Sequence, residues 1–224
     1  MRDSRDISTA DRLLEGVRRF RTDVYPNRRK VYQEAARTQQ RPHSLVITCA
    51  DSRIDPELIT QSGPGDIFVT RNIGNLVPAY GEMLGGVSAV IEYAVAALKV
   101  NHIVICGHTD CGAMKALMQP EESAKYPTVN AWLRNAQAAY SIVEARNTTT
   151  GVRRVLDELI EENVLLQLVH LRTHPSVASR LAVGELTMQG WVYDIGEGDV
   201  RIHDPEMNRF VRIDDFKTSS KTSA

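Results

Sequence analysis

Two short stretches of the 224-residue sequence carry residue types that can bind and use a metal ion. One is Cys49-Ala50-Asp51-Ser52-Arg53, and the other is His108-Thr109-Asp110-Cys111-Gly112. Zinc prefers thiolate and imidazole ligands, and a catalytic zinc site usually has three protein ligands and one open position. Cys49, His108 and Cys111 could supply those ligands, because one loop-to-helix turn can present both His108 and Cys111. The sequence therefore predicts a catalytic zinc site.

Asp51 and Arg53 are placed to act beside such a metal. Two thiolates weaken zinc as a Lewis acid, so lowering the pKa of bound water towards ~7 needs help from neighbouring groups. Asp51 could accept a hydrogen bond from zinc-bound hydroxide and fix which lone pair faces the substrate. Arg53 could hold Asp51 ionised through a bidentate pair. If Arg53 released it, Asp51 could move onto the metal and switch the site off.

A structural zinc site is the main alternative to this interpretation. Such a site normally closes with four Cys or His ligands. The remaining cysteine, Cys106, lies within a strand pattern and is typical of a small buried hydrophobic residue. A lone H-x-x-C motif is weak evidence for a metal site, and an exposed Asp–Arg pair contributes only ~0–1 kcal/mol to stability. The conjunction of all five residues at strand ends favours the catalytic interpretation.

Both stretches follow apolar, β-branched runs, and each precedes a helical pattern. Alternating strands and helices with continuous apolar strands predict a mainly parallel sheet with helices on both faces, and ligands bind beyond the carboxyl ends of such strands. We expect strands at 44–49, 66–70, 102–106, 186–195 and 200–203. We expect helices over 8–38 with an interruption at Pro26, from Pro56, after Gly86, and over 113–118, 128–146, 151–170 and 175–184.

The expected fold is therefore α/β, with a mainly parallel central β-sheet flanked by helices, an N-terminal helical arm and an added C-terminal strand. The expected parts are the arm at 1–38, a zinc-binding catalytic domain at 39–216 and a flexible tail at 217–224. The arm has a thin apolar stripe. It could pack on its own domain or lie across a second subunit, and both alternatives stay open.

Composition narrows the function classes. The net charge is -1 and the pI about 6.6, which gives no electrostatic reason to expect nucleic acid or an anionic membrane as partner. Three cysteines do not suggest a disulfide framework and suit a reducing compartment. The N-terminus lacks the apolar core of a secretory signal, and no apolar run approaches the ~20 residues of a membrane span. We expect a cytoplasmic protein.

The two motifs make the chain similar to the β-class carbonic anhydrases. Residues 49–53 match that family's C-[SA]-D-S-R, and 108–112 match its H-x-x-C-G. Residues 64–75 resemble its P-G-[DE]-x-F-x-x-R-N-x-[AG]-N motif. Segments 91–95 and 190–194 also fit, so the resemblance runs from about residue 40 to residue 204.

The resemblance implies a zinc enzyme that converts carbon dioxide reversibly to bicarbonate and a proton by zinc-hydroxide attack, with one Zn²⁺ per subunit. It implies a homodimer or a dimer of dimers as the assembly. Gln40 matches a position whose amide binds a substrate oxygen from the partner subunit. Phe68, Ile73 and Tyr93 match pocket walls, although core packing is an equal alternative for them. Gly112, the last residue of the second motif, is also expected to bind substrate.

Two departures from the family pattern are informative. Some bacterial members bind bicarbonate at a regulatory site of Trp, Arg and Tyr, which favours the state with the aspartate on zinc. Arg71 and Tyr193 match two of these positions, but the Trp position is Val46. We therefore predict an Asp51–Arg53 pair at neutral pH and no strong inhibition by bicarbonate. Ala97 stands where some members have a proton-transferring His, so buffer or another residue must carry the proton.

Three other functions compete with carbon dioxide hydration as interpretations of the sequence. A hydrolase of carbonyl sulfide or carbon disulfide could use the same scaffold, and assays of both substrates would distinguish it. A zinc-stabilised scaffold or bicarbonate sensor predicts a closed four-ligand site and no turnover. A nucleotide-binding α/β domain is disfavoured because the sequence lacks both the G-x-G-x-x-G and the P-loop pattern.

Overall fold

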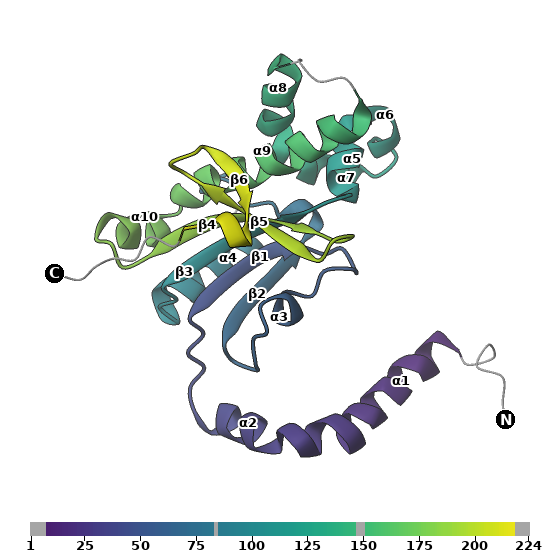
Figure 1. Ribbon diagram of the computed structural model, residues 1–224, viewed down its shortest axis with the longest axis vertical. Coiled ribbons are helices and arrows are strands. Elements are labelled where there is room, and N and C mark those ends of the chain that lie inside the picture. Colours follow the sequence, from purple (N-terminus) through teal and green to yellow (C-terminus); the bar gives the residue numbers. More distant parts are fainter. Residues whose placement is uncertain (1–7, 83–84, 147–150, 218–224) are drawn as a thin grey trace. The chain divides into compact units, whose positions relative to one another are not determined.

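The computed structural model describes residues 8–82, 85–146 and 151–217 (Figure 1). The chain divides into two compact units, residues 1–40 and 41–224. The flexible tail expected at 217–224 lies outside the described residues, apart from Lys217.

The first unit is helical, as its sequence pattern predicts. Helix α1 spans Thr9–Arg19, a π-helical turn spans Phe20–Val24, and α2 spans Tyr25–Arg37. Ser8 caps α1, because its hydroxyl accepts a hydrogen bond from the Asp11 amide at 3.2 Å. Pro26 lies in the first turn of α2, where a missing N–H is tolerated. None of the residues of α1 and α2 is buried.

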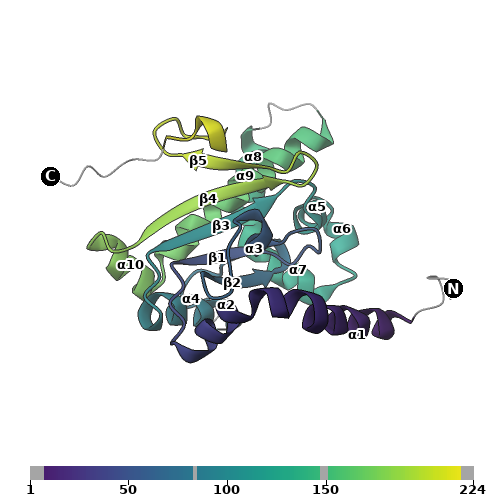
Figure 2. The ribbon, with the colours of Figure 1, turned by 60° about the horizontal axis from the view of Figure 1, so that its bottom comes forward.

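The second unit is built on a six-stranded sheet of order β2-β1-β3-β4-β5-β6. The first four of these strands are parallel, whereas β5 and β6 are antiparallel additions. Figure 2 shows β2, β1, β3, β4 and β5 following one another across the sheet. The bounds are β1 Ser44–Cys49, β2 Ile67–Asn72, β3 His102–His108, β4 Thr187–Asp194, β5 Asp199–Asp204 and β6 Arg209–Arg212.

Helices connect the parallel strands. Among the described residues, none of the helices is both long and apolar enough to cross a membrane. The helices are α3 Pro56–Ile59, α4 Gly86–Glu92 continued by a π-helical turn Tyr93–Ala97, α5 Gly112–Met118, α6 Pro120–Ser123, α7 Pro127–Leu133, α8 Gln137–Arg146, α9 Val152–Arg172 and α10 Pro175–Ala182. Short 3-10 turns span Ile73–Asn75, Arg134–Ala136 and Ile213–Asp215.

Helix α9 packs unusually close to strands β3 and β4. A Cβ atom added at Gly107 would lie 2.8 Å from Val164, and one added at Gly190 would lie 2.7 Å from the same side chain. Only glycine permits this approach, because real Cβ contacts are longer. The larger core cluster fills this side of the sheet and includes Ile105, Leu159 and Val164. The position of α9 is thus set by contact with β4 and with β3, the strand that leads to the second metal-ligand motif.

The observed elements differ from the expected ones in several places, among them β3, which runs to His108 and not to residue 106. Strand β6 was not predicted, because it has only four residues and its Arg-Phe-Val-Arg sequence lacks a clear alternation. Arg71 and Asn72 extend β2 beyond the predicted end at residue 70, since they pair with Thr48 and Cys49 of β1. The helix expected over 128–146 is two helices joined by the 3-10 turn Arg134–Ala136.

Candidate metal centre

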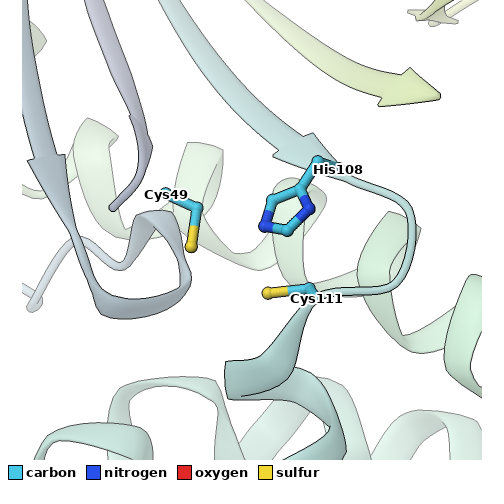
Figure 3. A group of neighbouring side chains, drawn as sticks. All are labelled: Cys49, His108 and Cys111. Carbon is cyan, nitrogen blue, oxygen red and sulfur yellow. The ribbon is translucent and has the colours of Figure 1, made fainter. Parts of the chain in front are cut away.

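Three buried side chains from the two motifs converge at the carboxyl ends of neighbouring strands. Cys49 is the last residue of β1, His108 is the last of β3, and Cys111 immediately precedes α5. Their ligand atoms all lie within 4.8 Å of one another. Figure 3 shows both sulfur atoms and the imidazole ring turned towards a common point. Parallel pairing of β1 with β3 delivers Cys49 and His108 to the same edge of the sheet.

The donor set fits a zinc ion. The Nδ1 atom of His108 lies 2.9 Å from the Thr109 carbonyl oxygen, which places the ring proton on that nitrogen. The other ring nitrogen, Nε2, is buried and has no hydrogen-bond partner in the described chain. A buried nitrogen lone pair without a partner costs free energy unless something binds it. Two sulfurs and one such nitrogen are the donors that zinc prefers.

The two ligand thiols have opposite pKa shifts. The hydrogen bond from Cys111 holds the pKa of Cys49 well below its ordinary value, and His108 and the Gly74 amide act in the same direction against burial. The pKa of Cys111 is raised well above its ordinary value, because its proton serves that hydrogen bond and because it is buried. Of the two thiols, Cys49 is therefore the one that loses its proton more readily.

Asp51 and Arg53 form the bidentate pair that their spacing suggests. Arg53 Nε donates to Asp51 Oδ1 at 2.9 Å, and its Nη2 donates to Oδ2 at 2.8 Å. The backbone amide of Arg53 also donates to Oδ1, at 3.0 Å. These bonds hold the pKa of Asp51 well below its usual range. Asp51 Oδ2 lies 3.9 Å from His108 Nε2, so the carboxylate borders the cluster of ligand atoms.

Asp110 holds Arg53 from the opposite side. Its Oδ2 accepts a hydrogen bond from Arg53 Nη1 at 3.0 Å, and its Oδ1 accepts one from Lys115. Lys115 and Arg53 lower the pKa of Asp110. Arg53, Asp110 and Lys115 line an open cleft of about 960 Å³. The contact between Asp110 and Arg53 could not be predicted, although Asp110 lies within the second motif, because it depends on how two loops meet.

Arg71 and Tyr193 do not form a joint anion site with Val46. The guanidinium of Arg71 donates to the carbonyl oxygens of Cys49, at 3.2 Å, and of Asp51, at 2.6 Å. Val46 is buried in a small apolar cluster against which Tyr193 packs. Arg71 therefore supports the backbone of the first motif, and an apolar side chain occupies the position of the family's Trp.

The residues matched to substrate-binding positions are only partly brought together. Phe68 and Tyr93 lie side by side, with ring centroids 6.1 Å apart, and half-exposed Tyr93 also lines a cleft of about 910 Å³. Ile73 is partly exposed in the turn after β2, and Gly112 is exposed at the start of α5. Gln40, the last residue of the first unit, is exposed. Their roles stay predictions.

Comparison with known proteins agrees with the motifs. A sequence model of the carbonic anhydrase family matches residues 44–200. A carbonic anhydrase of Pseudomonas aeruginosa is 47% identical over 201 residues, which cover 90% of each chain. The solved β-carbonic anhydrase CcaA has a TM-score of 0.89 at 38% identity and covers 94% of this chain and 93% of its own. Structures described as tetrameric β-carbonic anhydrases from Sordaria macrospora include one with a TM-score of 0.77 at 29% identity, covering 87% of this chain and 96% of the other.

Proposed function

Because the chain belongs to the carbonic anhydrase family and is an enzyme of that family, we propose that it catalyses CO₂ + H₂O ⇌ HCO₃⁻ + H⁺ at the centre described above. The observation that carries this proposal is the convergence of Cys49, His108 and Cys111 within 4.8 Å beside an ionised Asp51. The reaction needs a water molecule that is activated at neutral pH and held in one orientation. The donor set serves the first requirement and the carboxylate the second.

Cys49, His108 and Cys111 would hold one Zn²⁺ per subunit. When bound, the zinc supplies Lewis acidity that lowers the pKa of water towards ~7. The Thr109 carbonyl keeps His108 in the tautomer whose Nε2 faces the two sulfurs. The lowered pKa of Cys49 would reduce the proton cost of forming the site.

Asp51 would orient the reacting water. Because Arg53 keeps it ionised, Asp51 acts only as an acceptor and fixes the direction of the water O–H bond. Arg53 also keeps the carboxylate at its observed place, 3.9 Å from His108 Nε2, and away from the ligand position that it could otherwise occupy. We propose the dyad as the group that sets orientation, while the ligands set metal affinity.

Stopped-flow measurement of carbon dioxide hydration, combined with zinc analysis, tests the proposal on the wild type and on Asp51→Asn. We expect one zinc per chain in both proteins. Asparagine can donate as well as accept, so we expect turnover to fall by about 10² to 10³, the range seen when one oriented polar group is removed.

Full activity of Asp51→Asn at neutral pH would reject the orienting role of Asp51. Absence of turnover in a zinc-loaded wild type would reject the proposed reaction as a whole. Parallel assays with carbonyl sulfide and carbon disulfide distinguish the related hydrolases.

We also propose that the enzyme assembles as a homodimer or a dimer of dimers. The first unit presents an apolar stripe of Leu13, Leu14 and Val17, whose side chains are all exposed. Burying such a stripe against a second subunit would remove apolar surface from water. The relatives described as tetrameric support an oligomer. Light scattering of the full chain and of Leu13→Ser/Val17→Ser tests this, and a shift towards monomer is expected for the variant.

A cytoplasmic location is also proposed. All three cysteines are free, and two of them are needed as thiolates for the metal. A reducing compartment preserves them in that state.

A further inference from the structure

Four polar side chains occupy one face of α9 and the start of α10, a face that would be expected to be apolar. Three of them are spaced by four and three residues, which places them in line along α9, and the fourth immediately precedes α10. Each makes a hydrogen bond to the backbone of the segment 74–78. The four are Asn163, Gln167, His170 and His174.

The first two members form a closed amide network. Asn163 Nδ2 donates to the Gly74 carbonyl oxygen at 3.1 Å, and Gln167 Oε1 accepts from the Val77 amide at 2.8 Å. Gln167 Nε2 then donates to Asn163 Oδ1 at 2.9 Å and to the Asn135 carbonyl at 3.2 Å. Asn163 is 1% exposed and Gln167 is fully buried. A fully paired buried network rigidifies its surroundings, whereas a broken one leaves costly unpaired groups.

The segment held in this way reaches a metal ligand. The Gly74 amide donates to Cys49 Sγ at 3.4 Å, the range of an N–H···S hydrogen bond. Gly74 has a φ of 78°, and a Cβ atom there would lie 3.0 Å from Ala113. Glycine is therefore needed both for the backbone conformation and for the close contact.

The peptide group that carries this amide is fixed at its other end as well. Its carbonyl belongs to Ile73, and that oxygen accepts a hydrogen bond from Trp132 Nε1 at 2.8 Å. The following carbonyl is the one that Asn163 holds. Two side chains on different helices thus fix the orientation of the Gly74 N–H with respect to Cys49.

We propose that Asn163, Gln167 and Trp132 are positioning residues for the metal site, which act on Cys49 through the Gly74 amide. This inference rests on the proposed zinc site. An N–H donor withdraws charge from a thiolate, so it reduces the donation of Cys49 to the metal. In a site with two thiolates, that withdrawal restores part of the Lewis acidity that the second sulfur removes.

The position of α9 makes the arrangement rigid. Val164, next to Asn163, packs against Gly107 and Gly190 at a distance that leaves no room for a Cβ atom on either. Asn163 cannot move away from the sheet without opening this contact. The close packing of the helix and the hydrogen bond to the ligand are therefore parts of one structure.

The test measures metal binding rather than turnover. Zn²⁺ affinity is determined by chelator competition, and Co²⁺ loading reports the thiolate charge-transfer band. The variants are Asn163→Leu and Trp132→Phe, which remove the two fixing bonds from different helices. Both are expected to weaken Zn²⁺ binding by about tenfold or more, because the lost orientation of Cys49 outweighs the greater charge donation of its sulfur. Both should move the Co²⁺ band to longer wavelength, because a thiolate that loses a donor is easier to oxidise.

Thr173→Val is the matched control. Thr173 accepts a hydrogen bond from the Tyr80 amide at 2.8 Å, so it holds the chain just beyond the segment 74–78 and away from Gly74. We expect wild-type affinity and an unchanged band. If Asn163→Leu fails to fold, as judged by circular dichroism, Trp132→Phe carries the test.

Wild-type affinity and an unshifted band in the folded variants would overturn the inference and leave the proposed function standing. A wild type that binds neither Zn²⁺ nor Co²⁺ through its cysteines would overturn both. A loss of affinity in Thr173→Val equal to that in Asn163→Leu would also overturn it, because general loosening of the segment would then explain the effect.

Discussion

Two cysteines on neighbouring strands of the sheet have opposite chemistry. Cys49 ends β1 and is 5% exposed, while Cys106 lies within β3 and is 4% exposed. Hydrogen bonds, the largest from Cys111, hold the pKa of Cys49 well below its ordinary value. Burial raises the pKa of Cys106 to about 12. Two cysteines of nearly equal exposure thus have pKa values shifted in opposite directions.

The difference lies in what each sulfur meets. Cys49 points into the side of the sheet where Cys111 and the Gly74 amide donate hydrogen bonds to its sulfur. Cys106 points into the opposite side, where it shares a small cluster with Val46 and Val104. A thiolate needs donors or positive charge, and an apolar cluster provides neither. Alternation along the strands, rather than depth in the molecule, separates the two environments.

Replacing each cysteine in turn tests this comparison most strongly. We expect Cys49→Ser to lose its zinc and to lower carbon dioxide hydration by about a thousandfold or more, because metal catalysis contributes several kcal/mol. Cys106→Ser should keep one zinc per chain and nearly all of its activity. Metal analysis and stopped-flow assays of both variants give the answer, with circular dichroism as the control for folding. Equal loss in the two variants would show that the separation of the two sides is wrong.

The charge state of the thiols provides a second test. In the metal-free wild type we expect one thiolate to persist at pH values well below 9, the ordinary value, because the pKa of Cys49 is lowered. Protonation should occur only as the pH falls through that lowered pKa. Ultraviolet absorbance of the thiolate, followed during an acid titration, measures it.

The signal should disappear in both Cys49→Ser and Cys111→Ser, since the hydrogen bond between the two side chains is the main cause of the lowered pKa, and remain in Cys106→Ser. A thiolate signal that appears only near pH 9 in the wild type would contradict the pairing.

The same comparison shows what the sequence could predict. The ligands and the fold class follow from local rules: apolar runs form parallel strands, and polar residues at their carboxyl ends meet at one edge. The Asp51–Arg53 pair is also local, because only one residue lies between its members.

Contacts between distant segments could not be derived in this way. Arg53 meets Asp110 only because Asp110 adopts a φ of 62° in the loop after β3. Asn163 reaches Gly74 only because Gly107 and Gly190 let α9 approach the sheet. The spacing of Asn163, Gln167, His170 and His174 was a visible signal of a polar helix face.

Asp110→Asn tests the contacts of Arg53 on the face of the sheet that carries Cys49. The variant keeps the shape of the side chain but removes the charge that faces Arg53 and Lys115. Exposed ion pairs contribute little, so we expect the rate constant kcat/KM to fall by no more than about fivefold. Lys115→Met, which leaves the Arg53 contact in place, should have a smaller effect. A loss as large as that in Asp51→Asn would show that Asp110 is required to hold the dyad.

The smallest effect on the rate is expected from bicarbonate, which tests the face of the sheet that carries Cys106. Val46 is buried next to Val104 and Cys106, and the guanidinium of Arg71 is engaged by two carbonyl oxygens. The apolar side chain of Val46 gives an anion there no hydrogen-bond donor, so bicarbonate should not stabilise a state with Asp51 on the metal. Initial rates should show no inhibition by bicarbonate beyond the reverse reaction. A zinc-loaded crystal at pH 8 should retain the Asp51–Arg53 pair. Asp51 bound to zinc under those conditions would mean that the apolar side controls the metal side, and that the two faces of the sheet are coupled rather than separate.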